Sequence, residues 1–293
     1  MASLKDIKQK IGGVKKTSQI TSAMNMVAAS KLRGAQLKME SFRDYAEKFN
    51  AAMGNLSGGM QSGQFPLMDA REVKTVELIV VTSDRGLCGS FNSHIISRAL
   101  KLIAEKQKEG KEVSVVCVGK KGYAKLRHGG LVRKNYSDIM AKFEMYNART
   151  IAQEVADNFL DGQADEVFLI YPQFVSVAVH KPAVMSFLPV QPVVEAETGG
   201  EKGEESATAY SYEPGSDEIM TVLQPLYLNV MVYHAMLEAG AGEHAARMTS
   251  MDNATKACGD IVHDLTLVYN KARQGSITSE LMDIVGGAEA LKG

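Results

Sequence analysis

The chain has 293 residues, and its 33 Lys and Arg against 34 Asp and Glu give a formal net charge of −1. This balance argues against a protein that binds nucleic acid through its overall charge. A hydrophobic content of 45% with 23% charged residues supports packed cores and excludes a wholly disordered or fibrous chain, and the length suggests about two domains.

The N-terminal segment is predicted to form one long helix over residues 1–60. All seven prolines lie between Pro66 and Pro225, and proline breaks helix interiors. Apolar or small residues recur at alternating spacings of three and four, the heptad pattern of a coiled coil. This seam contains Leu4, Ile7, Ile11, Val14, Ser18, Thr21, Asn25, Ala28, Leu32, Ala35, Met39, Phe42, Ala46, Phe49, Met53 and Leu56. Its middle, residues 18–28, is small and polar.

The central part of the chain is predicted to alternate between strands and helices. Strands are expected at residues 76–82, 113–118 and 167–171, and helices at residues 93–108 and 147–160. A β-α-β-α-β order implies a parallel sheet with crossover helices. We therefore expect a Rossmann-like α/β domain over residues 61–215.

Residues 193–217 are predicted to form an acidic mobile loop at the end of this domain. Eight acidic residues lie from Glu195 through Glu218, against one lysine, Lys202. Such a composition favours a loop, with a short edge strand at residues 210–212.

A second long helix is predicted over residues 216–293, after a turn and cap at residues 214–216. Pro225 is expected to kink or restart it near its beginning. Its seam contains Ile219, Leu223, Leu226, Val230, Tyr233, Leu237, Gly240, His244, Arg247, Met251, Ala254, Cys258, Ile261, Leu265, Val268 and Ala272. This seam also loses its bulk midway, at Gly240, His244 and Arg247.

The two terminal helices are expected to pair, because one enters the central domain and the other leaves it. The pairing should be antiparallel, with the weak middles of the two seams close together and the longer C-terminal helix projecting past its partner. The predicted fold is therefore α/β: a long antiparallel coiled coil plus a central domain with a mainly parallel sheet.

The segment SDRGLCGSFN, residues 83–92, lies between a predicted strand and a predicted helix. Nucleotide-binding α/β folds place their phosphate loop at this point. However, Gly86 and Gly89 match neither G-x-G-x-x-G nor G-x-x-x-x-G-K-[ST]. We therefore favour a tight βα turn with a role in protein contact over nucleotide binding.

Catalytic and metal-binding patterns are weak. Cys88 with His94, or Ser90 with His94 and Asp84, would supply a nucleophile and a base, but there is no G-x-S-x-G elbow. The six histidines form no H-x-x-x-H or H-x-H pair, and there is no Cys-x-x-Cys. We expect no catalytic residue, cofactor or metal.

Charge is concentrated in the terminal helices. Residues 1–40 carry eight Lys and Arg against Asp6 and Glu40. A solvated helix face is the ordinary explanation, and a basic rod inside an acidic protein sleeve is the functional alternative. His244 and Arg247 lie on seam positions, where they would set the register of the helices or be gripped by a partner.

Three blocks of sequence closely resemble the γ subunits of F-type ATP synthases. They are ITSAMNMVAASKLRGAQ at residues 20–36, DRGLCGSFN at residues 84–92, and residues 245–290, especially LVYNKARQGSITSEL at 267–281 and IVGGAEAL, which runs from 284 to 291. The blocks occur in the family's order and spacing, and the resemblance covers essentially the whole chain.

This resemblance implies a non-catalytic central shaft, present in one copy per complex. The partners in the family are the hexamer of α and β subunits, whose bore the paired helices fill, the ε subunit and the membrane c ring. Proton flow turns the c ring and the shaft, and the shaft drives the catalytic sites through their states. No nucleic acid and no direct membrane insertion are implied.

The resemblance also assigns roles by motif position. Contacts with the α and β subunits that affect coupling are implied for Met24, Arg247, Gln274, Thr278, Glu280, Lys31 and Arg33. Contacts of the foot with ε or the c ring are implied for Asp84, Arg85, Tyr212 and Glu213.

No apolar signal-peptide core follows Met1, no apolar run approaches the roughly 20 residues of a membrane span, and an Arg- and Ser-rich transit region is missing. We therefore expect a bacterial protein, peripheral on the cytoplasmic face of the cell membrane. Two alternatives remain: an α/β enzyme or ligand-binding domain on a coiled-coil stalk, which would bind nucleotide or turn over substrate alone, and a scaffold coiled coil, which would form homodimers.

Overall fold

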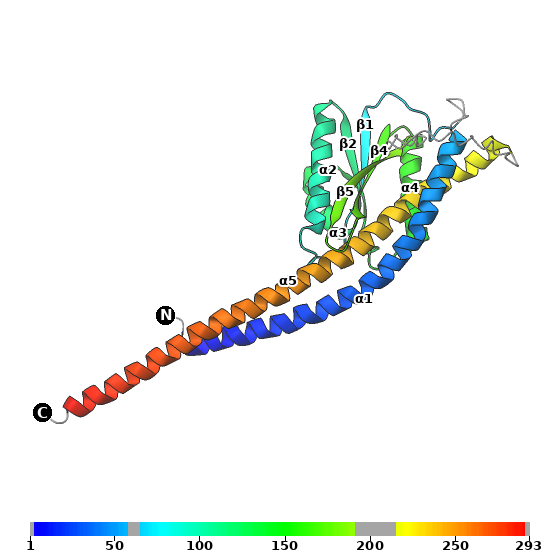
Figure 1. The fold of residues 1–293 in the computed structure, drawn as a ribbon. Helices are drawn as coiled ribbons and strands as arrows, with labels where there is room; N and C mark the ends of the chain where they lie inside the picture. Colours follow the sequence, from blue (N-terminus) through cyan, green and yellow to red (C-terminus); the bar gives the residue numbers. More distant parts are fainter. Residues whose placement is uncertain (1–2, 58–64, 191–214, 291–293) are drawn as a thin grey trace, which may run out of the picture. The chain divides into compact units, whose positions relative to one another are not determined.

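The computed structural model describes residues 3–57, 65–190 and 215–290 (Figure 1). The chain forms two compact units, one of residues 31–246 and one of residues 1–30 with 247–293. The two long helices α1 (Leu4–Ser57) and α5 (Ser216–Ala290) contribute to both units. The predicted fold class, long terminal helices with a central and mainly parallel sheet, is confirmed.

A five-stranded sheet is the centre of the larger unit. Its strands are β1 (Thr75–Val81), β2 (Glu112–Val118), β3 (Val132–Tyr136), β4 (Glu166–Phe174) and β5 (His180–Leu188), in the order β3-β2-β1-β4-β5. Strands β1 to β4 are parallel, and β5 is antiparallel to β4. The three strands expected from the sequence are present, but β3 and β5 were missed.

The two missed strands are the edges of the sheet, which explains the weak signal. The sequence of β3 is VRKNY, too polar for a buried strand, and β5 contains Pro182, which usually argues against a strand. An edge strand tolerates both features, because one side of it makes no ladder hydrogen bonds.

Helices cover both faces of the sheet and create two separate cores (Figure 1). The helix α2 (Phe91–Lys108) covers one face, together with α3 (Lys120–Leu126), which the single turn η1 (Arg127–Gly129) follows. The helix α4 (Met145–Leu160) covers the other face with α5 and the second half of α1. Both predicted crossover helices are thus observed, as α2 and α4.

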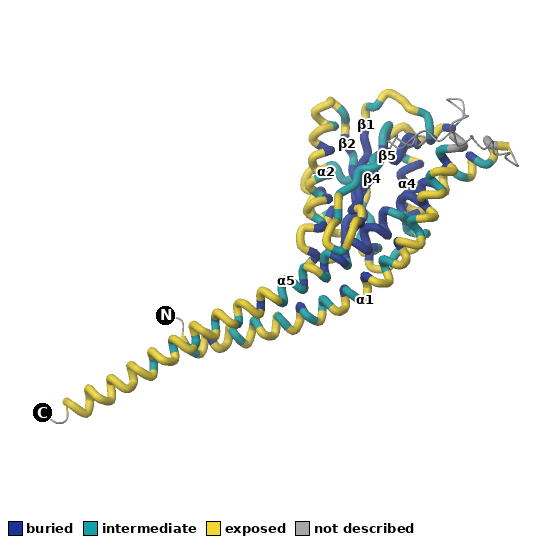
Figure 2. The backbone as a smooth tube through the Cα atoms, in the orientation of Figure 1, coloured by how far each residue is buried: buried dark blue, intermediate teal, exposed yellow. Residues whose placement is uncertain are grey.

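Within the larger unit, α5 is a core helix rather than one strand of a simple coiled coil. Every residue from 235 to 243 is buried, on all sides of the helix, as Figure 2 shows by the dark stretch of its tube. It packs against the sheet and α4 on one side and against α1 on the other. The expected seam position Leu226 is wrong for this reason, since Leu226 is 36% exposed and its neighbour Tyr227 is 6% exposed.

In the smaller unit, α1 and α5 pack along a narrow seam. On α1 the expected residues Ile7, Thr21 and Ala28 are buried. On α5 the expected positions Ile261 and Val268 are wrong, since both are about half exposed. Their neighbours in the sequence, Val262 and Tyr269, are half-buried and occupy the seam with Cys258, Leu265 and Ala272.

Three further expectations concern α5, the acidic segment and membrane-spanning helices. The helix α5 runs through Pro225 without a restart. Most of the acidic segment 193–217, including the expected edge strand at residues 210–212, lies outside the described residues. Among the residues that are described, no helix is long and apolar enough to cross a membrane.

Candidate functional site

A polar layer joins the two helices of the smaller unit. The hydroxyl oxygens of Thr21 and Thr255 lie 2.7 Å apart, within hydrogen-bond distance, and Asn25 Nδ2 donates to the carbonyl of Met248 at 3.0 Å. These contacts fall in the small, polar middle of the α1 seam. They confirm that the helices are antiparallel in this unit and fix their register.

This layer brings together two of the predicted site residues. Met24 precedes Asn25 and is half-buried, and Arg247 precedes Met248 and is only 9% exposed. Because Asn25 bonds to Met248, the segments of Met24 and Arg247 face each other across the helix pair.

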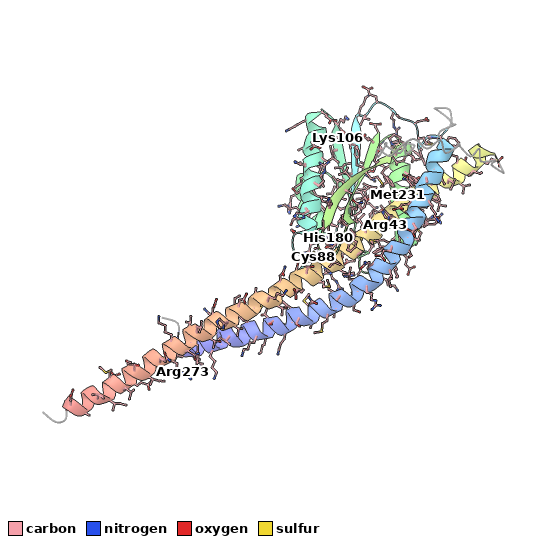
Figure 3. The ribbon with its side chains drawn as sticks, viewed as in Figure 1. Arg43, Cys88, Lys106, His180, Met231 and Arg273 are labelled. Atoms are coloured by element: carbon pink, nitrogen blue, oxygen red, sulfur yellow. The ribbon has the colours of Figure 1, made fainter. Side chains whose placement is uncertain are left out.

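The predicted residues near the C-terminus lie on a part of α5 that has no partner helix within its unit. Counting in opposite directions from the Thr21–Thr255 contact places Leu4, the first residue of α1, level with about residue 272. Gln274, Thr278 and Glu280 are all exposed, and their contacts are local, such as Thr278 Oγ1 donating to the carbonyl of Gln274 at 2.9 Å. Figure 3 labels Arg273, near the level at which α1 begins.

This unpaired end of α5 exposes large apolar side chains. All residues from 277 to 290 are exposed. The large hydrophobic ones are Ile277, Leu281, Met282, Ile284 and Val285. Exposed apolar patches of this kind mark surfaces that contact other proteins.

The outer face of α1 also carries exposed apolar residues, which the sequence analysis did not single out. In the smaller unit these are Ile20, Met26 and Val27, each more than half exposed. Their signal in the sequence was the presence of large apolar residues between seam positions. The predicted Lys31 and Arg33, in the larger unit, are exposed on the same helix.

The loop between β1 and α2 is held by Asp84. Its Oδ1 accepts from the backbone N–H groups of Lys120 and Asp138, at 2.9 and 3.0 Å, and its Oδ2 accepts from the N–H of Met140 at 2.9 Å. One carboxylate therefore ties together the loops that follow β1, β2 and β3. The neighbouring Arg85 is exposed.

These contacts decide between the chemical alternatives for the loop. Both oxygens of Asp84 are committed to backbone N–H groups, so they do not serve a Ser90–His94–Asp84 triad. Cys88 is buried at 3% exposure, and its sulfur accepts from Asn92 Nδ2 at 3.2 Å, whereas His94 is exposed on α2. The segment is a tight βα turn, as favoured from the sequence.

The turn also holds Leu87 in an uncommon backbone conformation. Leu87 has φ 62°, a region that costs a bulky residue about 1–3 kcal/mol. Its side chain is 62% exposed. The clamp made by Asp84 thus fixes a loop that presents Arg85 and Leu87 outward.

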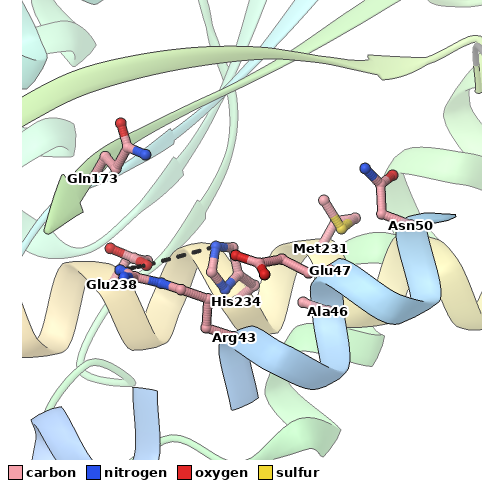
Figure 4. Close-up of a pocket in the computed structure, with 8 residues that line it drawn as sticks. All are labelled: Arg43, Ala46, Glu47, Asn50, Gln173, Met231, His234 and Glu238. Carbon is pink, nitrogen blue, oxygen red and sulfur yellow. Dashed lines mark hydrogen bonds and ion pairs between the residues drawn. The ribbon is translucent and has the colours of Figure 1, made fainter. Parts of the chain in front are cut away.

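A partly buried ion pair joins α1, β4 and α5 in the larger unit (Figure 4). Arg43 Nη2 lies 2.6 Å from Glu238 Oε1, and the other oxygen of Glu238 accepts from the N–H of Phe174 at 2.6 Å. Glu238 is 1% exposed. The hydrogen bond to Glu238 raises the pKa of Arg43, and burial lowers the pKa of the adjacent His234, an effect that Glu238 opposes. Sequence reasoning missed this pair because Arg43 and Glu238 are 195 residues apart.

Two predicted residues, Tyr212 and Glu213, lie outside the described residues. Within the described ranges, no group of three or more His, Cys, Asp and Glu is placed to hold a metal ion.

Known proteins resemble the chain over its full length. The family model for ATP synthase matches residues 3–291. The ATP synthase gamma chain of Desulfotalea psychrophila is 66% identical over 292 residues and that of Maridesulfovibrio salexigens is 48% identical over 296 residues, with all of this chain and of each relative covered.

Solved structures give the same fold. A chain of the Tetrahymena thermophila mitochondrial ATP synthase, in a structure of its central stalk and c ring, has a TM-score of 0.60 at 26% identity, covering 80% of this chain and 99% of that one. A chain of the Euglena gracilis mitochondrial ATP synthase has a TM-score of 0.68 at 19% identity, covering 98% of this chain and 94% of that one. With two helices paired through a polar layer, a clamped sheet domain and full-length matches at up to 66% identity among these relatives, the chain belongs to the ATP synthase gamma chain family.

Proposed function

We propose that the chain is the central rotor subunit of an F-type ATP synthase. In this role it couples proton flow through a membrane c ring to ATP synthesis or hydrolysis on a hexamer of α and β subunits. The observation that carries the proposal is the unpaired end of α5, where residues 277–290 are all exposed and five of them are large and apolar. Exposed apolar side chains gathered on one helix end mark a surface that contacts another protein.

The chain itself performs no chemistry in this proposal. The side chains that look most reactive in the sequence have structural tasks, since Asp84 binds three backbone N–H groups and Cys88 is buried. Catalysis belongs to the α and β subunits. The rotor acts by contacting the three catalytic sites unequally, and unequal contact is what allows a partner to shift a conformational equilibrium.

The residues that contact the hexamer divide into two groups. Met24 and Arg247 act at the polar layer, where a movement of one helix displaces the other through the hydrogen bond between them. Exposed residues on the unpaired end of α5 and on the outer face of α1 bind the inner surface of the hexamer. These are Gln274, Thr278, Glu280, Lys31 and Arg33.

The sheet domain provides the foot that contacts the ε subunit and the c ring. Within the turn of β1 and α2, Arg85 makes the contact and Asp84 holds the loop in shape. A contact with ε or the c ring is also proposed for Tyr212 and Glu213, on their motif position alone. The complex holds one copy of the chain, bound peripherally at the cytoplasmic face of a bacterial cell membrane. The central-stalk and c-ring assembly of the Tetrahymena relative supports this arrangement.

Co-expression with the α and β subunits from a bacterial relative tests the proposal. Native mass spectrometry should find one copy of this chain in a hexamer of α and β, and ATPase activity should depend on that copy. A chain that stays outside the complex and binds nucleotide alone would support the stalked α/β enzyme instead. A stable homodimer would support the scaffold alternative.

A further inference from the structure

A polar cavity of about 130 Å³ opens where α1, β4 and α5 meet in the larger unit (Figure 4). Its volume is far above the roughly 10–15 Å³ that one water needs. The lining residues are Arg43, Ala46, Glu47, Asn50, Gln173, Met231, His234 and Glu238. None of these positions belongs to the motifs by which the sequence was assigned its function.

The positive charge in this cavity is paired through one nitrogen of Arg43. Arg43 Nη2 donates to Glu238 at 2.6 Å and to the carbonyl of Phe174 at 3.2 Å. Glu238 is fully used as well, because its second oxygen accepts from the N–H of Phe174. The two charges of the pair therefore largely cancel for a group bound in the cavity, and the pair holds the cavity walls in place.

A negative charge remains uncompensated. Burial lowers the pKa of His234, and Arg43 is the one permanently charged cation among the lining residues, beside two carboxylates, Glu238 and Glu47. Glu47 is exposed and, within the described part of the chain, its carboxylate accepts no hydrogen bond. Figure 4 shows that carboxylate turned toward His234.

Two amide side chains and two apolar side chains line the cavity beside the Glu47 carboxylate. Gln173 is exposed at the rim, and the side-chain oxygen of Asn50 accepts one hydrogen bond, from the hydroxyl of Tyr227, which leaves its second lone pair available. Ala46 and Met231 are 4% and 8% exposed and supply apolar surface. A carboxylate above apolar carbon suits a long cationic side chain, whose methylene stem packs while its head donates hydrogen bonds.

We propose that this cavity, with Glu47 as its exposed carboxylate, is a docking pocket for an arginine or lysine side chain of a partner protein. A metal ion is a poor occupant, because no group of three or more His, Cys, Asp and Glu is placed to hold one in the described ranges. An anion would meet the Glu47 carboxylate and an arginine that is already paired. The inference rests on the proposed function only for the identity of the complex in which the partner is sought.

Photo-crosslinking in the assembled complex tests the pocket. The full chain, with p-benzoylphenylalanine replacing Gln173 in one preparation and Val175 in another, is assembled with the α, β and ε subunits and the c ring, and assembly is verified by native mass spectrometry. Val175 is 55% exposed and lies outside the cavity. A crosslinker at this position leaves the cavity open and should still capture the same partner. After irradiation, peptide mapping should place the crosslink next to an Arg or Lys of another subunit.

Substitutions at Glu47 then test the charge. Glu47→Lys should lower the crosslink yield about fivefold or more and Glu47→Gln about two- to threefold, and reversing the mapped partner cation to Glu should restore the yield with Glu47→Lys. Asp44→Lys is the matched control, because Asp44 is exposed on the same helix outside the cavity, and it should change the yield less than about twofold. The pocket proposal is wrong if the complex assembles but forms no intersubunit crosslink, or if the crosslink yield is the same in the Glu47 variants as in the unchanged chain. Either result leaves the rotor proposal intact. Failure to assemble contradicts the rotor proposal, and the crosslink yield of the isolated chain toward each purified partner subunit then tests the pocket alone.

Discussion

Thr21 on α1 and Thr255 on α5 face each other with their hydroxyl oxygens 2.7 Å apart, although they are 234 residues apart in the sequence. Each hydroxyl also lies within hydrogen-bond distance of a carbonyl of its own helix, at Ser18 and at Met251. A polar contact of this kind in the seam specifies register, because a slipped pairing leaves buried polar groups without partners.

Replacing both threonines should therefore cost little stability and reduce the accuracy of the register. We expect Thr21→Val and Thr255→Val each to lower the free energy of unfolding by about 0.5–1.5 kcal/mol, and the double variant to lose less than the sum. Chemical denaturation of the four proteins in a double-mutant cycle measures this coupling. Strictly additive losses would contradict a direct hydroxyl contact. The exposed Thr17, replaced by Val, is the control.

The Arg43–Glu238 pair should be a sensitive contact of the larger unit. Arg43→Met leaves the 1% exposed carboxylate of Glu238 without its cation, and we expect a loss of about 2–4 kcal/mol, since Arg43 itself is about one-third exposed. Arg43→Met with Glu238→Gln should recover most of that loss, because the amide oxygen still accepts from the N–H of Phe174. Thermal and chemical denaturation check both values. Equal losses in the single and double variants would show that the charge is irrelevant.

Local patterns predicted the regular elements well, and long-range contacts decided what they missed. The seam of α1 could be predicted because each of its residues up to Met53 is at least half-buried against one neighbour. On α5, Ile261 and Val268 were chosen over Val262 and Tyr269 because periodicity alone does not separate adjacent apolar positions. The Asp84 clamp joins residues 36 to 56 positions apart, and no local pattern encodes such partners.

Stability should fall as the pH drops below about 6.5, through two histidines of the larger unit. Burial lowers the pKa of His180 and of His234, so the folded protein binds protons less readily than the unfolded chain. Their neutral forms stabilise the fold fully above the unfolded pKa of about 6.5, and this stability is lost as the pH falls from there toward the folded pKa values. Groups near His234 are Glu238, Arg43 and Glu47.

Denaturation midpoints at pH 7.5 and pH 5.5 measure this effect. The difference between the two midpoints should shrink in His180→Gln and in His234→Gln. The control is His128→Gln, which removes an exposed histidine and should leave the difference unchanged. A midpoint that rises on acidification in the unchanged chain would show the sign to be wrong.

Substitutions at Asp84 and Arg85 should affect different properties of the β1–α2 loop: its stability and its contact with other subunits. Asp84→Asn replaces one acceptor oxygen by an N–H donor that faces a backbone N–H, and we expect it to lower the free energy of unfolding by about 1–3 kcal/mol. Arg85→Ala, at an exposed position, should change stability by less than about 0.5 kcal/mol while weakening assembly with ε or the c ring. Denaturation and pull-down of the purified subunits measure the two properties. Unchanged assembly in Arg85→Ala would remove this residue from the foot surface.

Arg247 should affect coupling more than assembly. Its side chain is 9% exposed on a seam position, one residue from the Met248 carbonyl that accepts from Asn25. In Arg247→Ala the helices remain paired through that contact, so the complex should still form, whereas the angle of the rotor is transmitted to the catalytic sites less completely. Proton pumping per ATP hydrolysed in reconstituted vesicles should fall several-fold with ATPase activity retained. Lys256→Ala, at an exposed position paired with Asp252, serves as the control, and equal pumping by the two variants would show that the seam cation has no part in coupling.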